Sequence, residues 1–210
     1  MFEFDVILNA FVTLFVTIDP IGLAPIFLGI TGGMNRAQRL SVGIRGNLIA
    51  LFILVLFLVA GQSILDTLGI TIHAFRVAGG LLLFYLAFEM VYGTRQERKA
   101  ETTEKAITVD QIANIAVFPL ALPLIAGPGA ISATILLASE QDGSWEWRLV
   151  LIGVIVGILL MVQLAFIAAE LIDKYLGNTG RMILTRLLGV LLAALSVQFV
   201  VDGLTALVGG

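Results

Sequence analysis

Residues 6–35 read VILNAFVTLFVTIDPIGLAPIFLGITGGMN, and Asp19 is the single charged residue among them. A helix needs about 20 mainly apolar residues to cross a bilayer, so this stretch is long enough to span a membrane. Pro20 and Pro25 interrupt it, and each proline removes a backbone donor and disrupts the preceding helical turn. The sequence therefore predicts a transmembrane helix that is broken at membrane depth, with the break at Asp19-Pro20.

The second half of the chain repeats this pattern. Residues 111–139 are free of charge and contain the other three prolines, Pro119, Pro123 and Pro128. Further charge-free apolar stretches occupy 46–65, 77–88, 149–169 and 187–201. We therefore predict an all-α membrane protein of six transmembrane helices, in which the first and the fourth helices are broken at membrane depth.

The composition supports a membrane protein and excludes several functions. Of 210 residues, 59% are hydrophobic and 13% are charged, whereas a soluble domain is about a quarter charged. The net charge of −3 is spread along the chain, which excludes the basic face that nucleic acid requires. Cysteine is absent and His73 is the single histidine, so neither thiolate chemistry nor a histidine metal cluster is available. We expect no enzymatic activity, no cofactor and no nucleic-acid partner.

The two halves align at fixed offsets. Pro20 pairs with Pro128 at an offset of 108 residues. The other matches are Leu68-Gly69 with Leu176-Gly177, Arg76 with Arg186, Gly79 with Gly189, and Gly93 with Gly203. Because each half has three spans, an odd number, the second half enters the membrane from the opposite side. We predict two inverted three-helix repeats, residues 1–93 and 111–210, joined by a charge-rich, solvated cytoplasmic linker at 94–110.

The distribution of Lys and Arg predicts the orientation. All 12 of these residues except Arg76 and Arg148 fall on one side of the predicted spans, and that side faces the cytoplasm by the positive-inside rule. The N-terminus, MFEFD, lacks the positive region of a signal peptide, so the first span should stay in the protein. We expect a multi-pass protein of the cell inner membrane with both termini on the extracytoplasmic side.

The residues at the two breaks predict a binding site. Asp is a favoured N-cap and Pro suits the first helical position, so half-helices should begin at Pro20 and, with Gly127 as a weaker cap, at Pro128. Two half-helix N-termini would then meet near the midplane and favour a carboxylate. Asp19 would bind an ammonium group, a sodium ion or a proton. The substrate-binding candidates are Asp19, Pro20, Gly22, Pro25, Asn47, Pro123, Gly127, Pro128 and Gly129.

Alternative interpretations of these features remain open at the level of sequence. The two segments are also compatible with proline-kinked helices that neighbours pack, with Asp19 as a satisfied cap. Gly153-x-x-x-Gly157 predicts a close helix approach, within the chain by default or otherwise between protomers. A homo-oligomer is therefore an open alternative.

The motifs IDPIGLAPIF at 18–27 and PLALPLIAGPGAI at 119–131, in a six-span chain of this size, resemble the MarC family of prokaryotic inner-membrane proteins. The resemblance covers essentially the whole chain. It implies a transporter related to exporters of the lysine-exporter type, with small neutral amino acids such as alanine and glycine as the substrate class. The antibiotic resistance in the family name is not carried over.

A secondary transporter of a small zwitterionic solute, surrounded by membrane lipid, is therefore the expected function. A coupling ion, H⁺ or Na⁺, is left open. The alternatives are a channel or exporter for another small solute, and a membrane scaffold that transports nothing.

Overall fold

The computed structural model describes residues 3–32, 34–95, 115–141 and 144–208, and in these residues it shows helices and no β-strand. The elements are α1 (Phe4–Ile18), α2 (Pro20–Ile30), α3 (Arg36–Thr67), α4 (Ile72–Tyr92), an irregular helical segment η1 (Ala116–Ile125), α6 (Pro128–Ala138), α7 (Trp145–Ile167) and α8 (Ala169–Val208). The all-α fold is confirmed. Most of the predicted linker, 96–110, lies outside the described residues.

The lengths of the helices fit a protein that crosses a membrane several times. Within the described residues, five helical stretches are long and apolar enough to span a bilayer: 4–30, 36–67, 72–92, 145–167 and 182–208. The pair η1 and α6 adds a sixth if it counts as one span, although its two parts are bent by 58°. The charged stretch between the last two predicted spans is helical, because α8 runs without interruption from Ala169.

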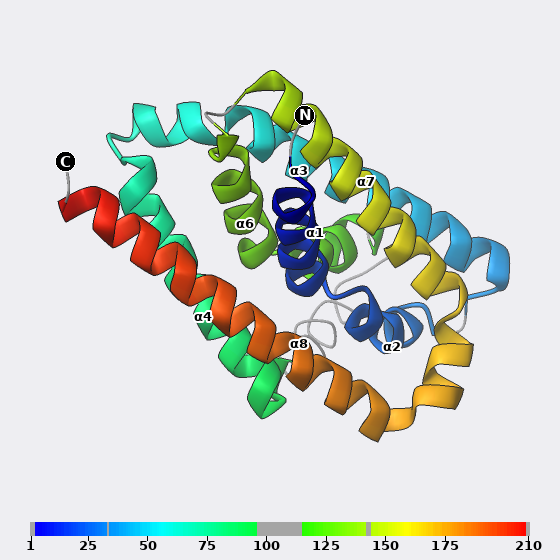
Figure 1. The fold of residues 1–210 in the computed structure, drawn as a ribbon. Coiled ribbons are helices and arrows are strands. Elements are labelled where there is room, and N and C mark those ends of the chain that lie inside the picture. The colour runs from blue at the N-terminus through cyan, green and yellow to red at the C-terminus, as the bar shows by residue number, and fades with distance from the viewer. Residues whose placement is uncertain (1–2, 33, 96–114, 142–143, 209–210) are drawn as a thin grey trace.

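α1 and α2 form the centre of the bundle (Figure 1). In the most apolar 18-residue stretch of α1 and α2, 67% of the residues are buried, whereas in the corresponding stretch of α3 the buried share is 28%. The outer helices instead expose large apolar side chains, such as Phe52 on α3 and Leu160 and Leu164 on α7. Such a large exposed apolar surface is not stable in water. The exposed apolar side chains of the outer helices therefore indicate a surface that faces lipid.

α4 and α8 pack along one side of the molecule in opposite directions (Figure 1). Glycines permit this close approach: a Cβ atom placed on Gly203 would lie 3.0 Å from the carbonyl oxygen of His73, and one on Gly189 would lie 3.1 Å from that of Ala87. The contacts near both ends of the pair therefore need a residue without a side chain.

The prediction that Gly153 and Gly157 pack within the chain is wrong. No described atom lies within 4 Å of a Cβ atom placed on either residue. The close approaches are made by other glycines, because Gly153 lies on an exposed face of α7.

Candidate functional site

The first helix break is centred on one residue, Asp19. Its backbone lies in the left-handed region (φ 60°), which Asp tolerates better than most residues because its short side chain bonds locally. Its N–H donates to the carbonyl oxygen of Phe15 and ends α1, while its carboxylate accepts from the N–H of Gly22 at 3.0 Å and begins α2. The predicted cap, with Pro20 at the first helical position, is confirmed.

The second break is built differently. The backbone of η1 is extended at Phe118 and Leu122, because a residue that precedes a proline is disfavoured in the helical region. α6 then begins at Pro128, with Gly127 as its N-cap and no side chain bonded to its first turn. The N–H groups of Gly129 and Ala130 therefore have no partner from a capping side chain or from within the helix.

A buried arginine reaches the first break. Arg95 follows the end of α4, and 2% of its surface is exposed. Its guanidinium donates to the carbonyl oxygens of Val16 at 3.3 Å and of Thr17 at 2.6 Å. One guanidinium nitrogen lies 4.0 Å from a carboxylate oxygen of Asp19. The prediction of a solvated linker therefore does not hold for Arg95.

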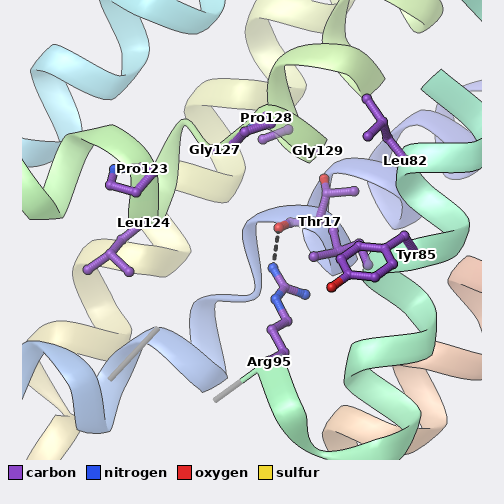
Figure 2. Close-up of a pocket in the computed structure, with 11 residues that line it drawn as sticks. Thr17, Leu82, Tyr85, Arg95, Pro123, Leu124, Gly127, Pro128 and Gly129 are labelled. Carbon is purple, nitrogen blue, oxygen red and sulfur yellow. Dashed lines mark hydrogen bonds between the residues drawn. The ribbon is translucent and has the colours of Figure 1, made fainter. Parts of the chain in front are cut away.

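A cavity of about 370 Å³ lies between the last turn of α1, just before the first break, and the second break (Figure 2). Its described lining residues are Thr17, Leu82, Tyr85, Leu86, Arg95, Pro123, Leu124, Gly127, Pro128, Gly129 and Ala130. In Figure 2, Arg95 points towards the backbone of Thr17 from one side, and the turn from Gly127 to Gly129 lies on the other side of Thr17. Segments more than a hundred residues apart in the sequence thus share one cavity.

The two walls of this cavity carry opposite partial charges. The last turn of α1 presents carbonyl oxygens and ends at the carboxylate of Asp19, so this wall attracts cations, and the guanidinium of Arg95 already lies there. The start of α6 presents N–H groups that no side chain caps, so it attracts anions. Such a pair of walls is suited to a small solute that carries both charges.

Comparison with known proteins places this helical bundle in a family. The model of the MarC family integral membrane proteins matches residues 4–208. The chain belongs to the MarC family.

Relatives of this MarC protein occur in bacteria and archaea, and those compared carry the description UPF0056 membrane protein. One from Archaeoglobus fulgidus is 41% identical and covers 93% of this chain and 90% of its own length. One from Buchnera aphidicola is 38% identical, with 99% and 95% covered. The protein YhcE of Escherichia coli is 35% identical, with 100% and 96% covered. No solved structure gives a significant match.

The structure brings some of the predicted MarC site residues to the cavity and not others. Pro123, Gly127, Pro128 and Gly129 line it. Asp19 is not among the lining residues, but one of its carboxylate oxygens lies 4.0 Å from the guanidinium of Arg95, which lines the cavity. The remaining candidates, Pro20, Gly22, Pro25 and Asn47, are not among its described lining residues. Asn47 on α3 instead donates to Gln163 on α7 at 2.9 Å.

The residue that sequence reasoning missed is Arg95. It lies at the start of a charge-rich stretch, TRQERK, where its neighbours conceal it. The one available signal is its position two residues after Gly93, which ends α4 in a left-handed conformation. A cation so close to the end of a membrane helix is within reach of the bundle interior.

A second polar cluster lies at the far end of α6, beyond the apolar part of the helix. Arg76, in the first turns of α4, donates to Ser139 at 3.4 Å, and Glu140 supplies a carboxylate whose charge offsets the unfavourable position of this cation near a helix N-terminus. Burial raises the pKa of Glu140 to about 6; Arg76 opposes this shift and Asp202 adds to it. This MarC protein thus carries charged groups at the other end of the helix that forms the second break.

Proposed function

We propose that this MarC protein is a secondary transporter of small neutral amino acids, such as alanine and glycine, across the cytoplasmic membrane. The observation that carries the proposal is the cavity in which the uncapped start of α6 and the carbonyl end of α1 converge. Paired interrupted helices that meet in this way are the usual sign of a transporter site. No catalytic role is proposed.

The charges of the cavity support a zwitterion as the substrate. The α-carboxylate would accept hydrogen bonds from the N–H groups of Gly129 and Ala130 at the start of α6. The α-ammonium would bind at the opposite wall, near Asp19. Because the substrate would supply both charges, neither wall needs a metal ion.

The walls of the cavity support a small side chain. A Cβ atom placed on Gly129 would lie 2.9 Å from a methyl group of Leu86, so there is little space at this wall. Prolines at positions 123 and 128 add rigid surface to the same side. This narrow wall favours a substrate with little bulk next to its carboxylate.

The helix packing supports two inverted repeats, with α1–α2, α3 and α4 in one and η1–α6, α7 and α8 in the other. α3 packs against α7 and α4 against α8, as repeat-related partners would. The contact between α2 and α7 has its counterpart between α6 and α3, and that between α4 and α6 has its counterpart between α8 and α2. Alternating access would arise when one repeat rocks against the other around the cavity.

The orientation in the membrane is part of the proposal. The pair of Arg39 and Glu170, 2.8 Å apart, lies at one end of the bundle, and Arg76 with Ser139 lies at the other. The excess of Lys and Arg at the first end supports a cytoplasmic location for it. Both chain termini would then lie on the extracytoplasmic side of the inner membrane.

Counterflow of labelled L-alanine into proteoliposomes tests the function. We expect counterflow with the natural chain, and loss to background with Gly129→Leu, because the new side chain fills the cavity. Gly153→Leu is the matched control, since no described atom lies within 4 Å of a Cβ atom placed there. Runs with and without sodium and a pH gradient would identify the coupling ion.

Other results would support other functions. Conductance without counterflow would indicate a channel. If no amino acid stabilises the protein against heat and none is exchanged, the scaffold alternative is favoured. Equal counterflow with Gly129→Leu and Gly153→Leu would show that the substrate does not bind in this cavity.

A further inference from the structure

Arg95 is bound to the part of the cavity wall that attracts cations. In a continuous helix the carbonyl oxygen of Val16 would accept from the N–H of residue 20, but that residue is Pro20, which has none. The guanidinium of Arg95 donates to this carbonyl and to that of Thr17. A protein cation thus satisfies acceptors that the helix break creates.

We propose that these carbonyl oxygens and Asp19 form a cation subsite, that Arg95 is its tethered occupant, and that the ammonium group of a small amine or amino acid binds by displacing the guanidinium. This rests on the proposed transport function for its physiological ligand. An ammonium group carries the same positive charge and up to three N–H donors, so it satisfies the same acceptors.

The alternative role for Arg95 is to bind the substrate carboxylate. The geometry favours the first role, because the guanidinium nitrogens already donate to carbonyl oxygens and one of them lies 4.0 Å from Asp19. The carboxylate also has its own donors at the start of α6. Arg95 therefore occupies the position of the substrate's positive group.

A tethered occupant has two consequences. It keeps the backbone acceptors of the break bonded while the substrate is absent, which matters because unpaired backbone groups inside a membrane are costly. It also lowers the apparent affinity for amines, because only the fraction of molecules with a vacant subsite can bind. Removal of the guanidinium should therefore tighten the binding of amines.

Binding of three ligands to the purified full chain tests the proposal. The ligands are L-alanine, with both charges; L-alaninamide, with the ammonium alone; and propionate, with the carboxylate alone. With Arg95→Gln we expect about tenfold tighter binding of L-alanine and L-alaninamide, and unchanged binding of propionate. The factor of ten corresponds to a guanidinium that occupies the subsite in about nine of ten molecules of the natural protein. Arg39→Gln is the control, because Arg39 pairs with Glu170 outside this cavity.

Two outcomes would overturn the proposal. Weaker binding of L-alanine and propionate with Arg95→Gln would show that Arg95 binds the carboxylate. Unchanged binding of all three ligands would show that it occupies no ligand position. If Arg95→Gln does not fold, Arg95→Cys can be compared before and after modification by aminoethyl methanethiosulfonate, which should restore the weaker amine affinity and would contradict the proposal if it did not.

A separate readout needs no substrate, so it distinguishes failure of the subsite from failure of the transport function. The chain has no cysteine, which makes Thr17→Cys a single thiol on the cavity wall. Its rates of reaction with the cationic aminoethyl and the anionic sulfonatoethyl methanethiosulfonates can be compared. Adding Arg95→Gln should raise the ratio of the cationic to the anionic rate about tenfold. An unchanged ratio would overturn the subsite, whether or not alanine is transported.

Discussion

The two helix breaks place proline in the same way but differ in polar chemistry. At the first break, Asp19 takes a left-handed conformation and caps α2 with its own carboxylate. At the second break, Gly127 precedes Pro128 in an extended conformation, and no side chain caps α6. One break therefore adds negative charge to the cavity region, whereas the other leaves backbone N–H groups available.

The difference between the breaks follows from space. The φ of Gly127 is −77°, which any residue can adopt. However, a Cβ atom at this position would lie 2.6 Å from the carbonyl oxygen of Pro123. The tight bend between η1 and α6 thus excludes a capping side chain. The same steric limit leaves the anion-binding end of α6 uncapped.

The strongest test of this difference removes the charge of the first break and keeps its geometry. Asn also caps helices and tolerates the left-handed region, so Asp19→Asn should retain the break. Because the ammonium would lose its charged partner, we expect L-alanine counterflow to fall at least 100-fold, about 2.7 kcal/mol. Counterflow within a factor of three of the natural protein would show that the charge of Asp19 has no part in binding.

The stability of the first break depends on both of its charged residues. Asp19→Asn removes the negative charge that lies 4.0 Å from the buried guanidinium of Arg95, and the loss of one charge from a buried pair is destabilising. In the double variant with Arg95→Gln we expect about 2 kcal/mol of this loss to be recovered, as a coupling energy. Thermal or denaturant unfolding in detergent, for the natural chain, both single variants and the double variant, measures it. Additive losses would mean that the two residues are not coupled.

Much of this comparison could be predicted from local sequence. The cap at Asp19 and the helix starts at Pro20 and Pro128 follow from the conformations that Asp and Pro prefer. Proline spacing also located the irregular segment η1. These features depend on residues within a few positions of each other, and local preferences determine them.

Which residues lie at the cavity could not be predicted in the same way. Arg95 joins the site through contacts with Val16 and Thr17, nearly eighty residues earlier, and no spacing rule encodes such a contact. Asn47 was a site candidate because it is polar, yet it bonds to Gln163 on another helix. For Gly153 and Gly157, the motif is compatible with close packing but does not specify a partner.

The second break can be tested through its steric limit. Gly127→Ala should destabilise the protein by about 1–2 kcal/mol, because the new methyl group contacts a backbone oxygen that has to move. Gly153→Ala places the same methyl group in open space and should change stability by less than about 0.5 kcal/mol. Thermal unfolding of both variants measures the difference. Equal effects would mean that the bend at Gly127 does not require a glycine.

The smallest expected effect lies at the far end of α6, where Glu140 follows the helix that forms the second break. Burial raises its pKa from 4.5 to about 6, so the folded protein holds this proton more tightly than the unfolded chain. The contribution of Glu140 to stability is therefore fully present below pH 4.5 and is lost as the pH rises through about 6. Partial exposure limits this contribution to about 1 kcal/mol.

The free energy of unfolding, measured from pH 4 to 7, tests this prediction. Glu140→Gln is the control, because it lacks this titration, and the difference between the two pH profiles gives the contribution of Glu140. A difference of the opposite sign would mean that the attraction of Arg76 outweighs burial, and that the end of α6 is held by an ion pair.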